Sequence, residues 1–144
     1  MNLSYIKKQL QFWADKKDVL HVKKLLTKED QILVKRKSEE LIQNIFTFDK
    51  PWDMERCQIP YKLKTLDWNI QLNDDEEWCF MLNRMDYLNY LVLSDHIEYA
   101  KTLILNWIEA HPTIQPEPST RTLDTGIRLM NFFEALPYLY ANRL

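Results

Sequence analysis

The sequence predicts an all-α protein, and three observations lead to this prediction. Apolar side chains recur at three- and four-residue spacing through most of the 144 residues. Glycine occurs only once, which leaves little of the turn chemistry that β-hairpins need. The prolines fall mainly between the periodic segments, where they would interrupt helices. Together these features predict a single helical domain over residues 1–144.

Capping signals followed by apolar faces predict the first two helices. Ser4 can cap a first helix that ends at about Lys17. Its apolar face would consist of Ile6, Leu10 and Trp13. Thr27 and Asp30 resemble a capping box that opens a second helix, ending at about Phe46. The core-facing positions of this second helix would be Ile32, Leu33, Leu41, Ile42 and Ile45.

A long ordered loop is predicted between the second and third helices, from Thr47 to Asn73, because the helical period breaks there. Loops of this length in a compact domain are uncommon and often functional. The loop carries Trp52 and Trp68. Their flat faces could stack on sugar rings, or they could pack the loop onto the helices, and the sequence leaves both interpretations open.

The third and fourth helices follow this loop. Asn73 or Asp74 would cap a third helix to about Leu91, whose acidic first turn suits the positive end of the helix dipole. Ser94 would cap a fourth helix that ends before Pro112. This fourth helix presents a wide apolar surface, formed by Tyr99, Leu103, Ile104, Trp107 and Ile108.

A stiff, proline-rich connector over residues 111–119 separates the fourth helix from a fifth. The fifth helix would begin at Thr122 and end at about Leu136. After Pro137 the sequence stays apolar up to Leu144, as though a sixth helix had begun.

The only glycine of the chain, Gly126, falls inside this predicted fifth helix. Glycine in a helix interior costs about 1 kcal/mol relative to alanine. We therefore expect Gly126 either to let a neighbouring element pack closely against the helix or to leave open access at this point of its surface.

Composition and charge exclude several classes of function. A formal net charge of -2 gives no general attraction to nucleic acid. No apolar run reaches the length of a membrane span, and Met1–Leu20 lacks the apolar core of a secretory signal. The chain as given is therefore predicted to be cytoplasmic, or periplasmic or secreted if a leader has been removed. Cys57 and Cys79 are predicted to be free thiols, and neither a metal nor a cofactor is expected.

Two short motifs combine polar groups with apolar helix faces, Leu82-Asn83-Arg84 and Asp124-Thr125-Gly126-Ile127-Arg128. Arg84 and Arg128 could clamp a sugar carboxylate or sulfate through paired hydrogen bonds. The structural alternative is an ion pair between Asp124 and Arg128, which lie four residues apart. Asn83 could contact a sugar or bridge to a neighbouring helix, and Asp124 is expected to orient a partner rather than act as a base.

Three segments carry a longer pattern: EEWCFMLNRMDYLNYL (Glu76–Leu91), YAKTLILNWIEAHP (Tyr99–Pro112) and RTLDTGIRLMNFFEAL (Arg121–Leu136). They resemble the amino-terminal helical domain of heparinase II/III-type polysaccharide lyases, over roughly residues 46–136. The matching positions are Trp78, Phe80, Leu82, Asn83, Arg84, Trp107, Ile108, Asp124, Gly126, Ile127, Arg128 and Asn131. The chain departs from the pattern at Phe132, where the family more often has Trp, and near Ser119, where a Trp is expected.

The resemblance implies a partial α/α toroid of about five to six helices. In full-length members a β-sandwich domain follows, and the cleft between the two domains cleaves uronic-acid polysaccharides of the heparin and heparan-sulfate kind by β-elimination. An Asn neutralises the uronate carboxylate there, and Tyr and His transfer protons. These catalytic groups would lie beyond Leu144. This chain would then supply substrate-binding residues only, namely Asn83, Arg84, Asp124 and Arg128, and would be inactive alone.

Five or six helices are too few to close a toroid, so an apolar edge is expected to be exposed. The missing carboxy-terminal helical and β-sandwich regions, or a partner chain, would cover it. The expected ligand is an acidic polysaccharide, and whether the chain alone is an enzyme stays open. The alternative function is that of a non-catalytic helical protein-interaction module.

Overall fold

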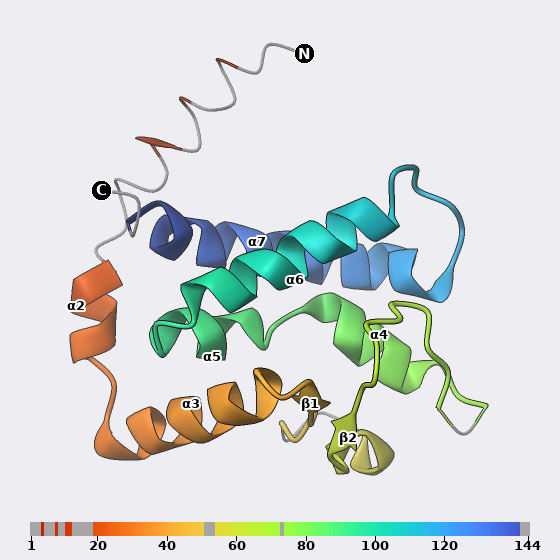
Figure 1. Ribbon diagram of the computed structural model, residues 1–144, viewed down its shortest axis with the longest axis horizontal. Helices are drawn as coiled ribbons and strands as arrows, with labels where there is room; N and C mark the ends of the chain where they lie inside the picture. Colours follow the sequence, from red (N-terminus) through yellow and green to blue (C-terminus); the bar gives the residue numbers. More distant parts are fainter. Residues whose placement is uncertain are drawn as a thin grey trace.

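The computed structural model describes residues 4, 8, 11–12, 19–50, 54–72 and 74–141, and this part of the chain is mostly helical (Figure 1). The first predicted helix, from Ser4 to about Lys17, lies almost wholly outside the described residues. The described helices are α2 (Val19–Lys24), α3 (Lys28–Leu41), α4 (Glu77–Arg84), α5 (Leu88–Leu93), α6 (Ile97–Ala110) and α7 (Thr122–Ala141). The prediction of a helical fold is confirmed at this level.

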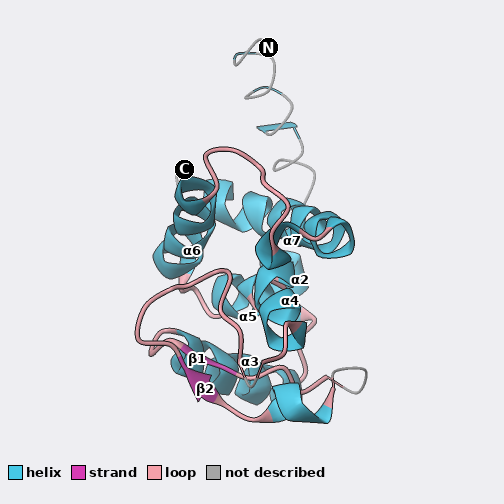
Figure 2. Ribbon diagram, turned by 90° about the vertical axis from the view of Figure 1, so that its right-hand side faces the viewer, coloured by secondary structure: helices cyan, strands magenta, loops and turns pink. Residues whose placement is uncertain are grey.

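The helices are arranged in layers, which Figures 1 and 2 show from two directions. α6 and α7 run side by side in opposite directions along one side of the molecule. α4 and α5 lie beneath them and both pack against α7, while α3 packs against α5 from the other side. The core therefore lies around α5, whose Leu88, Leu91 and Val92 are fully buried.

The end of the predicted second helix and the predicted long loop contain strands that the all-α prediction missed. Strand β1 (Ile45–Phe46) pairs antiparallel with β2 (Tyr61–Lys62), with Ile45 opposite Lys62 and Phe46 opposite Tyr61. A 3-10 turn over Glu55–Gln58 lies between them. α3 ends at Leu41 rather than at Phe46, because Asn44 adopts a φ of 59° and turns the chain into the sheet.

An aromatic cluster attaches this small sheet to the helices. The Phe46 ring packs edge-on against Tyr87 at 5.2 Å, and Phe48 packs against Trp78, also at 5.2 Å. Tyr61 meets Trp78 at 5.5 Å. Such edge-to-face pairs each contribute about 0.5–1.5 kcal/mol beyond the burial of their area. The cluster therefore holds the segment before α4 against the body of the protein.

The start of α3 confirms the predicted capping box. The Thr27 hydroxyl accepts the N–H of Asp30 at 3.1 Å, and the Asp30 carboxylate accepts the N–H of Thr27 at 3.0 Å. The side-chain hydrogen bond from Thr27, followed by the backbone one, lowers the pKa of Asp30. Both contacts satisfy donors that the first helical turn would otherwise leave without partners.

The buried face of α3 differs from the predicted one. Ile32 is 68% exposed, and Leu33 and Ile42 are also exposed. The helix instead buries Val34, Lys37, Ser38 and Leu41. Lys37 can lie inside because its Nζ donates to Asp49 at 2.6 Å, which compensates the buried charge. The buried face of α3 therefore lies on a different side of the helix from Ile32 and Leu33.

The predicted third helix, from Asn73 or Asp74 to Leu91, consists of two helices. Met85 interrupts it with φ 56° and ψ 31°, so α4 ends at Arg84 and α5 begins at Leu88. At the start of α4, Asp75 rather than Asp74 accepts the N–H of Glu77, at 2.9 Å. Asn73 lies outside the described residues.

Ser94 does not cap the fourth predicted helix. Its hydroxyl donates back to the carbonyl of Tyr90 at 2.7 Å and so ends α5 instead. α6 begins three residues later, at Ile97, and ends at Ala110 before Pro112, as predicted. Leu103 and Trp107 of its predicted apolar face are buried, whereas Ile108 is exposed.

α7 continues through Pro137 to Ala141, so no separate sixth helix begins there. A proline inside a helix removes one backbone hydrogen bond, and the burial of Pro137 and Tyr138 offsets that loss. Gly126 does not pack closely within the described part of the chain: a Cβ built on it meets nothing within 4 Å. Of the two roles expected for this glycine, open access at the helix surface is the one that fits this observation.

We predict that Thr27→Ala lowers the free energy of unfolding by about 1 kcal/mol, because it removes the side-chain half of the capping box. Urea titration followed by circular dichroism measures the loss. Thr102→Ala is the matched control, since Thr102 is an exposed threonine inside α6 and alanine has the higher helix propensity. Equal losses in the two variants would contradict the capping assignment.

Candidate functional site

Asp124 ties two arginines together at the start of α7. Its carboxylate is fully buried. Arg84 of α4 donates from Nε to Oδ1 at 2.7 Å, and Arg121 donates from Nε to Oδ2 at 2.5 Å and from Nη2 to Oδ1 at 3.0 Å. The hydrogen bond to Asp124 raises the pKa of Arg121. Asp124 is thus an orienter, as predicted, but the hydrogen bonds of its carboxylate go to Arg84 and Arg121 rather than to Arg128.

Arg128 is directed into the interior, which explains this change of partner. Its Nη1 donates to the carbonyls of Asn83 at 2.7 Å and Ser119 at 3.1 Å, and Nη2 donates to Thr125 Oγ1 at 2.9 Å. The guanidinium lies over the Trp107 ring at 3.9 Å. Burial lowers its pKa to about 10 while the charge of Asp124 opposes the shift, so Arg128 is still a cation at neutral pH. These contacts favour a bracing role over ligand contact.

Asn83 is also fully buried and bridges three parts of the fold. Its Nδ2 donates to the carbonyls of Trp68 at 2.7 Å and Cys79 at 2.9 Å. Its Oδ1 accepts the indole N–H of Trp107 at 2.9 Å. Of the two roles predicted for Asn83, bridging between elements fits these contacts.

The buried network contains residues that the sequence did not single out as partners. His111 donates from Nδ1 to the Trp107 carbonyl at 2.7 Å, and its Nε2 is hydrogen-bonded to Ser119 Oγ at 2.8 Å. Its ring stacks on Trp107 at 4.0 Å. Trp68 is buried, and its Nε1 donates to Asn106 at 2.8 Å, so this tryptophan packs the loop onto α6. Trp52 lies outside the described residues.

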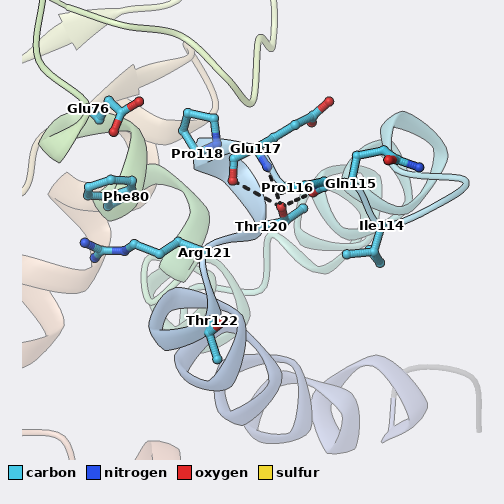
Figure 3. Close-up of a pocket in the computed structure, with 10 residues that line it drawn as sticks. All are labelled: Glu76, Phe80, Ile114, Gln115, Pro116, Glu117, Pro118, Thr120, Arg121 and Thr122. Atoms are coloured by element: carbon cyan, nitrogen blue, oxygen red, sulfur yellow. Dashed lines mark hydrogen bonds between the residues drawn. The ribbon is translucent and has the colours of Figure 1, made fainter.

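Two hollows flank the cluster of Arg84, Asp124 and Arg121. The larger has a volume of about 560 Å³ and is drawn in Figure 3. In it the Arg121 guanidinium lies 3.5 Å from the centre of the Phe80 ring. The carboxylates of Glu76 and Glu117 share this hollow with Arg121, so acidic groups outnumber the cation. This arrangement disfavours an anionic ligand.

The smaller hollow has a volume of about 230 Å³ and the opposite balance of charge. Arg84 lines it together with Phe48, Lys50, Met81, Asp86, Ile127 and Asn131. Lys50 forms an ion pair with Asp86. Asn131 donates from Nδ2 to the backbone carbonyl of Arg84 at 2.8 Å, which fixes its amide at the edge of the hollow. Two cations, one carboxylate and an amide make this hollow the candidate site for an anionic group.

The four predicted site residues therefore separate into two groups. Arg84, whose side chain is 21% exposed, lines the smaller hollow, and Asp124 positions it from the interior. Asn83 and Arg128 lie in the interior behind it. Sequence reasoning missed Lys50, Asn131 as a site residue, and Arg121. Arg121 lies three residues before Asp124 at the start of a helix, and this spacing could have indicated the ion pair between them.

The described residues contain neither a metal-binding cluster nor a membrane-spanning helix. No three His, Cys, Asp or Glu side chains among them are grouped so as to hold a metal ion. None of the described helices has both the length and the apolar character needed to cross a bilayer. Both cysteines are free thiols and are buried, as predicted for their redox state.

No family model, curated protein or solved structure matches this chain. The resemblance to heparinase II/III-type lyases therefore remains a prediction that rests on the motifs themselves.

We predict that Asp124→Asn lowers the free energy of unfolding by about 2–3 kcal/mol, because the two arginines lose their buried counter-charge. Chemical denaturation at neutral pH measures it. Asp95→Asn is the matched control: Asp95 pairs with Lys23 on the surface, where an ion pair contributes at most about 1 kcal/mol. A loss of similar size in both variants would mean that Asp124 does not anchor the cluster.

We also predict that the thiols resist modification in the folded protein. Burial raises the pKa of the Cys79 thiol to about 12, and Cys57 is fully buried as well. A chromogenic disulfide reagent at pH 8 should detect neither thiol until a denaturant is added. The pKa of Cys79 in the folded protein lies above the ordinary value of 9.0. The contribution of this thiol to stability is therefore complete below pH 9 and is lost as the pH rises toward 12. Cys79→Ala should make that alkaline loss shallower, and an unchanged slope would contradict the assignment.

Proposed function

We propose that the chain is the helical substrate-binding portion of a polysaccharide lyase of the heparinase II/III type, folded as part of an α/α toroid. The polymer is an acidic polysaccharide that contains uronic acid, of the heparin or heparan-sulfate kind, and the reaction class is β-elimination. The hollow beside Arg84 binds a carboxylate or sulfate of that polymer.

The observation that carries the proposal is the meeting of the two motif segments at one place. Arg84 of the first motif is bound to Asp124 of the second. Arg128 holds the carbonyl of Asn83, and Asn131 holds the carbonyl of Arg84. Five of the residues that match the family pattern at α4 and α7 thus belong to one bonded assembly beside an open hollow, as expected for residues that support a site.

The chemistry of the smaller hollow suits recognition of an anion rather than proton transfer. β-elimination needs a base for the C5 proton and hydrogen bonds that neutralise the uronate carboxylate. Arg84, Lys50 and Asn131 supply cationic and amide donors. The described residues that line the hollow include no tyrosine or histidine. We therefore assign binding to this hollow, and the chain by itself is expected to bind the polymer without cleaving it.

One observation favours the alternative, a non-catalytic helical interaction module. The outer face of α7 exposes several large apolar side chains, of which Met130 is 69% exposed. Apolar patches of this kind mark contact surfaces. The two functions concern different faces and do not exclude each other.

Binding of heparan-sulfate oligosaccharides, measured by isothermal titration calorimetry at low salt, tests the proposal. Lys50→Ala should weaken binding about tenfold, because it removes one of the two cations of the hollow. Arg84→Lys keeps the charge but loses the paired donors of the guanidinium, and it should weaken binding less. Lys35→Ala is the matched control, since Lys35 lies in an exposed ion pair on α3.

A loss of affinity in Lys35→Ala equal to that in Lys50→Ala would point to general charge attraction and refute the site. The absence of any binding by the wild-type protein would favour the interaction module. Release of unsaturated uronate, detected by its ultraviolet absorbance, would show that the chain has catalytic groups that the proposal does not assign.

A further inference from the structure

The outer face of α7 is apolar along most of the helix. Its exposed large residues are Leu123 (61%), Leu129 (50%), Met130 (69%) and Phe133 (48%). Thr122 and Gly126 are the uncharged exposed residues that complete this face, and Glu134 lies exposed at its edge. We call these six positions the α7 outer stripe. None of them is charged.

The stripe lies opposite the side of α7 that holds the buried cluster. Residues 124, 128 and 135 are buried. With 3.6 residues per turn, the stripe positions lie on the opposite side of the helix from them. With about half or more of each large side chain exposed, the patch covers on the order of 400 Å². A patch of that size is comparable to the largest apolar patch of a typical monomer, which is often functional.

Gly126 forms a notch in the middle of the stripe. A Cβ built there meets nothing within 4 Å, so the notch is open. Leu123 lies one turn before it and Met130 one turn after it. A glycine at such a position lets another helix approach closely and receive or insert a side chain. The close approach of another helix would explain why glycine occupies this position, which packing inside the chain does not explain.

We infer that the α7 outer stripe binds the same stripe of a second copy of this chain, with the two α7 helices antiparallel. A two-fold axis near position 128 pairs Gly126 of each copy with Met130 of the other, so the most exposed side chain enters the notch. The same axis pairs Leu123 with Phe133. The contact is closed and self-complementary, as in most homodimers.

The charges at the ends of the stripe select the antiparallel direction. The positive end of the helix dipole lies at the start of the stripe, and Glu134 lies just beyond Phe133. Antiparallel helices place Glu134 of one copy beside the start of α7 in the other. Parallel helices would place like charges together. A second copy therefore complements the stripe in both shape and charge.

The size of the patch sets the strength of this association. Two stripes with their flanking residues bury on the order of 1,000 Å², near the lower limit for specific interfaces. The dimer should therefore have a Kd in the low micromolar range or above, and should dissociate on dilution below it. The inference does not rest on carbohydrate binding, because Lys50 and Arg84 line a hollow outside the stripe.

Sedimentation equilibrium of the full chain at concentrations up to about 100 µM tests the inference. The wild-type protein should dimerise reversibly. Met130→Glu should weaken the dimer by at least tenfold while leaving the circular dichroism spectrum and sugar binding unchanged. Ile108→Glu is the matched control, because Ile108 is 49% exposed on α6, outside the stripe, and its substitution should leave the dimer intact.

Disulfide trapping tests the antiparallel register separately. The double variant Gly126→Cys with Met130→Cys should form a covalent dimer on oxidation, whereas Leu105→Cys with Ile108→Cys on α6 should not. The two native cysteines are buried and do not interfere. A wild-type chain that stays monomeric at about 100 µM would overturn the inference and assign the stripe to a different protein. Equal weakening by Met130→Glu and Ile108→Glu, or no trapped dimer, would overturn it as well.

Discussion

The buried guanidinium of Arg128 is the interaction on which the arrangement of the helices depends. A cation taken out of water is costly unless its donors are matched, and here carbonyls from α4 and from the connector before α7 accept from it. Its flat face rests on Trp107 of α6. One side chain therefore fixes α4, α6 and α7 relative to one another. The position of Arg84 follows from this, since the residue before it, Asn83, is held by the same group.

Neighbouring residues in the two motifs have different physical tasks. Asn83 and Arg84 are consecutive on α4, so their side chains point about 100° apart, one into the core and one toward the surface. Asp124 and Arg128 are four residues apart on α7 and both face inward, but they bind different partners. A motif of this kind thus combines an internal brace with one outward group that the brace positions. In the proposed function only that outward group meets the polymer.

Local signals in the sequence predicted local structure well and long-range pairing poorly. The capping box at Thr27 and the end of α6 before Pro112 depend on residues close in sequence, and both predictions were confirmed. The pairing of Asp124 with Arg128 was wrong because spacing within one helix does not reveal a competing arginine on α4. The burial of Lys37 could not be foreseen either, since it depends on an ion pair with Asp49 outside the helix. Strands of two residues are too short to show an alternating pattern.

Met85 shows how a turn can be hidden within an apolar segment. It adopts the left-handed backbone conformation that glycine favours, at a strain of about 1 kcal/mol, yet its side chain is completely enclosed. Enclosing a methionine side chain contributes about 1.5–3 kcal/mol, so filling the space outweighs the strain. Glycine would relax the backbone but leave a void at the joint between α4 and α5. The bend at this joint is therefore maintained by the volume of the Met85 side chain rather than by chain flexibility. A homologue could keep the bend with any side chain that fills the same space.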